Sequence, residues 1–348
     1  MYHCGLDGHL KTTQICVVND AGKRVLEENL DTATTDLEAL LGPLVRDGLR
    51  VGLETSSLSY HFNDRLMAIG VTPQVWPANK LRVIAESRSK TDRNDARWMA
   101  ELLRAGCHPR GVRIPTEPER ELRDLLVARH LLIAKRTSIV QNAKSIALRQ
   151  GVSMKKRNLC LERGWVQLLA DPTLTPARKE VLAELHSAWK SLADSTARFT
   201  ATLEARASAD PGARRLRTIP GVGLLSSLWL LSALGDAKRF NRSREVGRYL
   251  GVAPSVRSSA AVRMNGHITR EGRPEVRWAW GQAAHAFVRS RASQGLLLRV
   301  WFEETAKRRG KKIAITALAR KLMVIAWHML KEETEFRGLR AQEVSEVR

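Results

Sequence analysis

Two aspartates three residues apart open a segment that the sequence predicts to be a helix. Asp92 and Asp95 stand in the run from Ser89 to Ala96, and apolar residues follow at helical spacing to residue 105. Residues three apart share one helix face, so the two carboxylates repel each other unless positive charge lies near them. The amino end of a helix supplies part of that charge, and a divalent cation supplies more. Alone, the pair is also consistent with an acid-rich first turn that is simply solvated.

Two more acids fall in the predicted strands before this helix. Asp7 lies inside a first strand at 2–8, and Glu54 lies near the end of a fourth strand at 50–55. The other predicted elements are strands at 12–18, 24–30 and 71–76, and helices at 34–47, 60–69, 79–86 and 92–105. Three antiparallel strands followed by alternating strands and helices is the element order of a ribonuclease H-like domain, in which the first and fourth strands are neighbours.

That order predicts a common meeting point for Asp7, Glu54, Asp92 and Asp95. Four carboxylates around one point require cations to balance their charge. Two Mg²⁺ ions roughly 3.5–4 Å apart, with Mn²⁺ as a substitute, can activate one oxygen and stabilise another in phosphoryl transfer. A turn residue at one strand end and an exposed acid at the other remain the simpler interpretations of Asp7 and Glu54 taken singly.

At Asp7-Gly8-His9-Leu10-Lys11, Glu54-Thr55 and Lys90-Thr91-Asp92-Arg93-Asn94-Asp95-Ala96 the chain resembles a known family. These motifs are similar to those of the Asp-Glu-Asp-Asp (DEDD) transposases of the "one-ten" insertion-sequence family, which are bridge-RNA-guided DNA recombinases. The resemblance implies a RuvC-like amino-terminal domain and a carboxy-terminal transposase domain. Ser56-Ser57 departs from the small residue that often follows the glutamate.

The charge of the chain indicates a polyanionic partner. Lys and Arg number 58 against 36 Asp and Glu, which gives a net charge of +22. Residues 206–348 carry 28 Lys or Arg and 12 Asp or Glu, and nucleic acid is the commonest partner of such a surface. The sequence predicts no membrane span and no signal segment. Four scattered cysteines favour a reducing compartment, so a bacterial cytoplasmic, nucleoid-associated location is expected.

A helical arm is predicted after a linker at Pro115–Pro118. Leu125, Leu132, Ile139 and Ile146 repeat every seven residues, as do the residues that follow each of them, which is typical of coiled-coil packing. A second amphipathic helix is expected at 177–208, after an irregular segment at 151–176. The two helices predict an antiparallel arm, and the apolar seam fits packing within the chain as well as between chains.

Two features of the third region could contact nucleic acid. Gly221 and Gly223 in Ile219-Pro220-Gly221-Val222-Gly223 indicate a helix-hairpin-helix turn whose backbone N–H groups approach a phosphate, although a plain helix–helix turn has the same pattern. Helices are predicted at 275–290, 294–307 and 313–331. Between the last two, a basic loop offers backbone electrostatics through Lys307, Arg308, Arg309, Lys311 and Lys312.

A serine-rich stretch at 251–261 is interpreted as a polar loop that leads into Gly266-His267-Ile268-Thr269-Arg270-Glu271-Gly272. A serine can attack a phosphodiester only if its proton is removed and the developing charge is countered, for example by arginines such as Arg257 and Arg270. Composition alone makes these serines ordinary loop residues. The resemblance places Ser259 at the family's nucleophile, with Ser258 as the runner-up because Ala260 stands where the family has glycine.

The sequence therefore predicts an α/β domain at 1–115, a coiled-coil arm at 116–210, a mostly helical transposase domain at 211–335 and a charged tail at 336–348. The function predicted from the resemblance is a transposase that recombines donor and target DNA through a Ser–DNA intermediate. It implies a structured guide RNA and a tetramer built as a dimer of dimers. The alternatives are a metal-dependent Holliday-junction endonuclease that uses water and a non-catalytic DNA-binding repressor.

Overall fold

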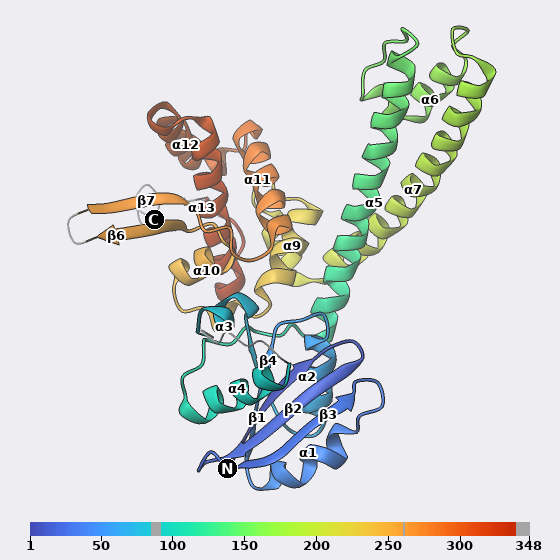
Figure 1. Cartoon of the computed structure of the whole chain (residues 1–348). Helices are drawn as coiled ribbons and strands as arrows, with labels where there is room; N and C mark the ends of the chain where they lie inside the picture. Colours follow the sequence, from blue (N-terminus) through green and yellow to red (C-terminus); the bar gives the residue numbers. More distant parts are fainter. Residues whose placement is uncertain (85–91, 260–261, 339–348) are drawn as a thin grey trace. The chain divides into compact units, whose positions relative to one another are not determined.

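The chain divides into two units, Met1–Pro115 and Thr116–Arg348. The computed structural model describes residues 1–84, 92–259 and 262–338, and the side chains of 82–84, 92–93, 256–259 and 262–265 lie outside the described part. The first unit is mixed α/β, and the second is mostly helical (Figure 1).

A mixed five-stranded sheet forms the centre of the first unit, in the order β3-β2-β1-β4-β5. β1 pairs antiparallel with β2 and parallel with β4, so the first and fourth strands are neighbours, as predicted. β2 also pairs antiparallel with β3, and β4 pairs parallel with β5. The strands are β1 (Tyr2–Gly8), β2 (Thr12–Asn19), β3 (Arg24–Asp31), β4 (Leu49–Glu54) and β5 (Gln74–Trp76).

Different helices cover the two faces of this sheet. Leu41 of α1 (Leu37–Arg46) and Phe62 of α2 (Ser59–Ala68) belong to one core with Leu6 of β1. On the other face, Ala96 of α4 (Asp92–Ala105) packs in a second cluster with Cys16 of β2. Successive strand residues alternate between the faces, so every second residue of β1 and β4 points toward α4. A short helix, α3 (Ala78–Ile84), follows β5.

The arm of the second unit is an antiparallel pair of helices, α5 (Glu117–Leu148) and α7 (Pro176–Ala209). Nε of Arg129 donates to Oγ1 of Thr200 at 2.7 Å. Nearer the base, Arg206 pairs with Glu121 at 3.0 Å. The segment expected to be irregular contains a short 3₁₀ helix at Asn158–Cys160 and α6 (Glu162–Leu169), which lies at the far end of the pair (Figure 1).

Only one of the two heptad series is well buried in the arm. Leu126, Val140 and Ala147 of the second series are at most 2% exposed, because they face α7 or the helical body. Leu132 and Ile139 of the first series are partly exposed. The deepest part of the seam is therefore filled within one chain, and a half-exposed apolar edge remains beside it.

The rest of the second unit is a helical body that carries one β-hairpin. Its elements are α8 (Pro211–Arg217), α9 (Leu224–Leu234), a 3₁₀ helix at Ala237–Arg239, α10 (Ser243–Tyr249), β6 (Pro254–Ser259), β7 (Val262–Ile268), α11 (Pro274–Arg289), a 3₁₀ helix at Ser293–Gly295, α12 (Leu296–Arg309) and α13 (Lys311–Glu332). The indoles of Trp280 and Trp327 are buried and donate to the carbonyl oxygens of Ser226 and Ala237 at 2.8 and 2.9 Å. These two tryptophans therefore serve the core.

α13 bears on the expectation that no segment spans a membrane. It is long and apolar enough to cross a membrane, judged by length and composition alone. However, 61% of its most apolar 18-residue window is buried inside the protein. Its apolar side chains, among them Leu318, Leu322 and Trp327, belong to the core of the helical body, which accounts for its composition.

Four other expectations were wrong in detail. β5 starts only at Gln74, after Pro73, whose ring nitrogen cannot donate to a sheet. The presumed loop at 251–261 contains β6, which pairs antiparallel with β7. The presumed basic loop at 307–312 is helical on both sides of Gly310. The predicted tail starts too early, because Phe336 is 5% exposed and its N–H donates to Oγ1 of Thr218 at 2.9 Å.

Candidate functional site

Asp7 and Glu54 lie at the carboxyl ends of two adjacent parallel strands. Leu6 of β1 pairs with Leu53 of β4, and the two acids are the next residue of each strand. They also point to the same face. A Cβ on Gly5 would meet Ala96 of α4, and one on Gly52 would meet Trp76 and Leu103 of that same side. Since strand side chains alternate, Asp7 and Glu54, two residues further on, face the side that α4 covers.

The direction of α4 brings its amino end to this edge. Arg104, in its last turn, donates to the carbonyl oxygen of Asp20 at 3.5 Å. Asp20 in turn binds the amino group of Met1 at 3.1 Å, so the carboxyl end of α4 lies by the start of β1. α4 therefore runs against β1, and Asp95 in its first turn lies toward the strand ends that carry Asp7. Helix direction and strand register together direct the first turn of α4 toward the strand ends that carry Asp7 and Glu54.

The carboxylate edge, as we name Asp7, Glu54, Asp92 and Asp95, is partly closed. The Asp7 side chain is 15% exposed, and its Oδ2 lies 3.4 Å from Nε2 of His9. The side chain of Asp92, the first residue of α4, lies outside the described part. Among the side chains that the structure describes, no three His, Cys, Asp or Glu residues are grouped closely enough to hold a metal ion. A shared metal site therefore remains a prediction that depends on Asp92 as well.

The predicted nucleophile lies at the tip of a hairpin. Ser259 ends β6, and its backbone pairs with Val262, the first residue of β7. Ser258 pairs with Arg263 in the same ladder. The side chains of these serines, and that of Arg257, lie outside the described part, as does the whole of Ala260. The structure thus places the backbone of Ser259 at the end of a two-stranded ribbon.

The opposite end of this ribbon is fixed tightly to the helical body. The N–H groups of Thr269 and Arg270 donate to the carbonyl oxygens of Ala253 and Gly251 at 2.9 and 3.1 Å. Arg270 is exposed and has a φ of 57°, a left-handed conformation that is costly for a residue with a side chain. Gly251 has a φ of +69°, and a Cβ there would collide with the backbone of Glu271. We call this region, 249–253 with 269–273, the hairpin base.

Arg277 is a contributor to the hairpin base that sequence reasoning missed. Its guanidinium donates to the carbonyl oxygens of Glu271 at 2.7 Å, Gly272 at 3.1 Å and Leu250 at 3.4 Å. Burial lowers the pKa of Arg277, and the nearby Arg270 adds to this shift. In a strongly basic chain, an arginine in the first turn of a helix resembles any solvated cation. The signal that could have found it is its place three residues after Pro274, directly behind the glycine turn.

The two glycines of the predicted helix-hairpin-helix turn have different surroundings. Gly221 has a φ of +85°, and a Cβ there would meet the backbone of Phe287 at 2.5 Å. Packing against α11 therefore explains this glycine without a phosphate. Gly223 caps α9 and has open space around its Cβ position, although its N–H is already bound by Oγ of Ser226 at 3.0 Å. Both glycines are exposed, so both remain candidates for a phosphate contact.

The predicted basic loop is a tight turn between two helices. Lys307, Arg308 and Arg309 form the last turn of α12, and Lys311 and Lys312 begin α13. Gly310 joins them with a φ of +85°. All five cations are exposed, so this basic turn presents a dense positive charge, as expected of a surface that binds a phosphate backbone.

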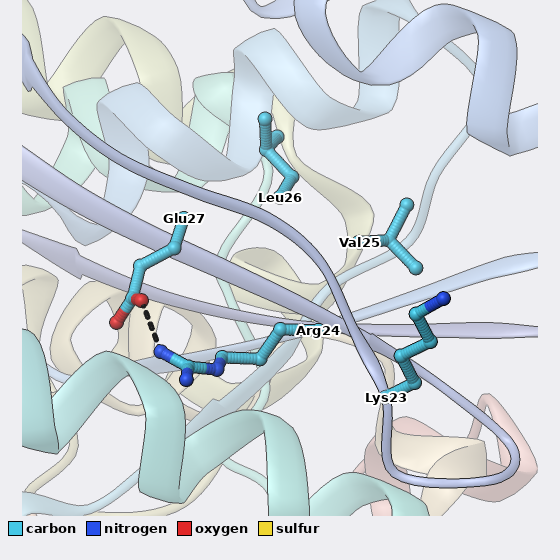
Figure 2. A pocket seen from close by; sticks show the side chains of 5 residues that line it. All are labelled: Lys23, Arg24, Val25, Leu26 and Glu27. Atoms are coloured by element: carbon cyan, nitrogen blue, oxygen red, sulfur yellow. Dashed lines mark hydrogen bonds and ion pairs between the residues drawn. The ribbon is translucent and has the colours of Figure 1, made fainter.

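A separate hollow lies along the edge strand β3 and contains none of the predicted residues. Figure 2 shows the side chains that line it, Lys23, Arg24, Val25, Leu26 and Glu27. The guanidinium of Arg24 pairs with Glu27 at 2.6 Å across it. Its lining has two cations and one acid and no second carboxylate that could share a metal ion. It gives no reason to move the site from the carboxylate edge.

Comparison with known proteins matches both parts of the chain. Residues 213–296 match the model of the "Transposase IS116/IS110/IS902 family", and residues 4–150 match a second transposase model of DEDD type. The transposase for insertion sequence element IS1111A of Coxiella burnetii (strain RSA 493 / Nine Mile phase I) is 25% identical over 338 residues, covering 96% of this chain and 90% of the relative. The pilin gene-inverting protein of Moraxella bovis is 31% identical over 124 residues, covering 35% of this chain and 37% of its own.

Proposed function

Because the chain belongs to the IS116/IS110/IS902 family of transposases, we propose that it recombines DNA through a serine nucleophile assisted by metal-binding acids. The observation that carries this proposal is the arrangement of the first unit. β1 and β4 present Asp7 and Glu54 at adjacent strand ends, on the face where α4 begins. This sheet order also supports a ribonuclease H-like, RuvC-like domain.

Asp7, Glu54, Asp92 and Asp95 would hold Mg²⁺, for which Mn²⁺ can substitute. Carboxylate oxygens are the ligands that Mg²⁺ prefers. The adjacent strand ends that carry Asp7 and Glu54, and the direction of α4 toward them, support this proposal. Bound Mg²⁺ would counter the negative charge that develops on the phosphoryl group. The imidazole of His9, 3.4 Å from Asp7, would help to orient that carboxylate.

Ser259 would attack the phosphorus of a DNA phosphodiester. The serine oxygen forms a new bond to phosphorus, the bond to the 3′ oxygen breaks, and the hydroxyl proton passes to solvent while the released 3′ oxygen takes one up. The product is a 5′-phosphoserine ester that preserves the energy of the broken bond for rejoining. Arg257 and Arg270, on the ribbon and at its base, would counter charge on the phosphoryl oxygens.

The remaining parts of the proposal concern partners. The basic turn and the amino end of α9 at Gly223 would bind the backbone of donor and target DNA. The resemblance further supports a structured guide RNA that selects both sites, and a tetramer in which the acids and the serine of one site come from different subunits. The half-exposed edge at Leu132 and Ile139 offers a surface for that assembly.

Trapping the covalent adduct tests the proposal. In a substrate nicked close to the cutting point, the short fragment that carries the released 3′ hydroxyl dissociates, so the DNA cannot be rejoined. The 5′-phosphoserine link then accumulates and survives denaturation. Ser259→Ala should abolish the adduct while DNA binding persists, because one hydroxyl adds little to affinity. Ser258→Ala, its neighbour in the same strand, is the matched control and should retain the adduct. Asp7→Asn should also stop adduct formation.

The same experiment separates the alternatives. Metal-dependent cleavage by Ser259→Ala at the wild-type rate, with no adduct in either protein, would overturn the serine mechanism in favour of a junction endonuclease that uses water. DNA binding by the wild-type chain without any cleavage, over a range of Mg²⁺ and Mn²⁺ concentrations, would favour a binding protein that acts as a repressor.

A further inference from the structure

The positive charge of the helical arm is concentrated at its far end. Residues 149–163 contain five Lys or Arg and one Glu. In contrast, the whole of α5 contains six Lys or Arg against four Asp or Glu, and the whole of α7 contains five against four. We call the five exposed cations of this end the tip surface: Arg149, Lys155, Lys156, Arg157 and Arg163.

A small core of its own holds the tip surface in place. Met154 and Leu159 are 8% and 0% exposed, and they bracket the three consecutive exposed cations at 155–157. The indole of Trp165 is fully buried and donates to the carbonyl oxygen of Leu159 at 2.9 Å. A Cβ on Gly164 would collide with the backbone of Asn158, so α6 packs directly on this segment. The cations are therefore presented by a fixed loop.

Glu162, the one acid of residues 149–163, is directed toward a partner on α7. Oε1 of Glu162 lies 2.9 Å from Nε2 of His186, close but without the alignment of a hydrogen bond. The imidazole of His186 is stacked on the indole of Trp165, with ring centroids 5.2 Å apart. In the part of the chain that the structure describes, none of the five cations forms an ion pair with a carboxylate. Their charge is available to an external anion.

The tip surface lies far along the arm from the core of the helical body. The arm leaves that body near Leu126, the one α5 residue buried in its core. Twenty-two residues of helix to Leu148 span about 33 Å at 1.5 Å per residue. Charges interact over only about 8 Å at physiological ionic strength. The tip surface therefore lies well beyond the reach of charges near Leu126, where the arm leaves the core of the helical body.

We propose that the tip surface binds the phosphate backbone of duplex DNA flanking the recombination site. DNA is favoured as the partner because the family acts on DNA, so this inference rests on that part of the proposed function and not on the serine chemistry. Consecutive cations without interleaved aromatic side chains suit phosphates and not stacked bases. Arm length and charge together would extend the footprint by about one duplex turn, since 33 Å corresponds to roughly ten base pairs at 3.4 Å each.

The test compares two triple variants of the full chain that lose equal charge. K155Q/K156Q/R157Q neutralises the tip surface, and K135Q/K190Q/R198Q neutralises three exposed cations on the shaft of the arm. Affinity for a 40-base-pair DNA duplex is measured against NaCl concentration. Each lost phosphate contact lowers the slope of log affinity against log salt by about 0.9. If all three cations of the tip variant contact phosphates, the magnitude of its slope should fall by about 2.7. At 0.1 M salt, the loss of one contact lowers the affinity about 8-fold, and the loss of three lowers it about 500-fold.

Further control measurements identify the source of any effect on DNA affinity. K155R/K156R/R157K keeps the charge and should keep the wild-type slope, and slow hydrogen exchange of the α6 amides reports that the tip remains folded. At saturating protein the tip variant should cut DNA at the wild-type rate. Asp7→Asn should stop cutting but keep the wild-type salt slope. A failure of the catalytic proposal can therefore be told apart from a failure of the tip proposal. Three outcomes would overturn the inference: equal slopes for the tip and shaft variants, a loss confined to duplex or hairpin RNA, or a changed oligomeric state with an unchanged slope.

Discussion

The packing of α4 on β1 can be tested by adding one methyl group. A Cβ on Gly5 would lie 1.9 Å from the carbonyl oxygen of Ala96 and 2.7 Å from the backbone N of Ala100. Both are backbone atoms of a helix, so no side chain can rotate away. In Gly5→Ala the strand and α4 must separate by roughly 1.5 Å to restore ordinary contact at 3.4 Å.

This displacement should affect both stability and chemistry. Overpacking of this kind costs roughly 1–3 kcal/mol, so amides of α4 should exchange their hydrogens about 5- to 150-fold faster when opening is local. A misplacement of about 1 Å at a reacting centre costs about 100-fold in rate. Because α4 carries Asp92 and Asp95, single-turnover DNA cleavage by Gly5→Ala should fall by about 100-fold or more, while DNA affinity is retained.

Gly42→Ala is the matched control in the same unit. A Cβ at Gly42 would meet only Cγ of Glu38, at 3.9 Å. Alanine is a better helix former than glycine, but the ring of Pro43 disfavours a helical residue with a Cβ before it, so the two effects oppose each other. Gly42→Ala should therefore change stability by less than about 1 kcal/mol and leave cleavage unchanged. If the α4 amides of Gly5→Ala exchange hydrogen at the wild-type rate, the close packing of α4 on β1 is refuted. If they exchange faster but the cleavage rate stays within threefold of the wild-type rate, the acids of α4 do not take part in the reaction.

The structure supports three further predictions. Replacing all five cations of the basic turn with Gln should lower the salt slope of DNA affinity by up to about 4.5, and an unchanged slope would assign the affinity to other surfaces. Glu at both Leu132 and Ile139 should reduce the oligomeric state seen by light scattering, whereas the same assembly before and after would mean that the half-exposed edge only serves its own chain. Arg277→Ala leaves three carbonyl oxygens without their donor, which should cost roughly 1.5–3 kcal/mol, with faster hydrogen exchange in β6 and β7 and at least about tenfold less adduct at unchanged DNA affinity. Arg277→Lys should recover part of this loss, and a normal adduct yield in the alanine variant would refute a positioning role.

The strand framework could be predicted because its signals are local. Period-two patterns and turn residues identified β1 to β4 to within a few residues, and the element order then implied that β1 and β4 are neighbours. Asp7 and Glu54 could be paired on that basis alone. The close approach of Gly5 to Ala96, which decides how near α4 comes to them, has no local signature, since a glycine in a strand has several explanations.

The hairpin was missed because its composition misleads. β6 begins with proline and consists mainly of small and hydroxyl residues, while Ala260-Ala261 is not a favoured two-residue turn. The ribbon is held at the hairpin base, where the guanidinium of Arg277 donates hydrogen bonds to carbonyl oxygens of two separate segments. Such contacts depend on tertiary structure, so the sequence could suggest Ser259 by resemblance but not the device that holds its strand.

The distribution of charge separates affinity from chemistry in this chain. The carboxylate edge is formed by acids, and a DNA phosphate that approaches them is repelled unless a cation intervenes. The basic turn and the tip surface lie on other elements, far from those acids in the sequence, and we propose that their exposed cations attract the same backbone. Surfaces that provide affinity can therefore change without altering the reacting geometry.

Conversely, Gly5 and Arg277 are buried or partly buried positions with no need to touch DNA, yet each fixes an element that carries a predicted reacting residue. Substitutions should accordingly fall into two groups, those that change the salt dependence of binding and those that change the rate at saturation.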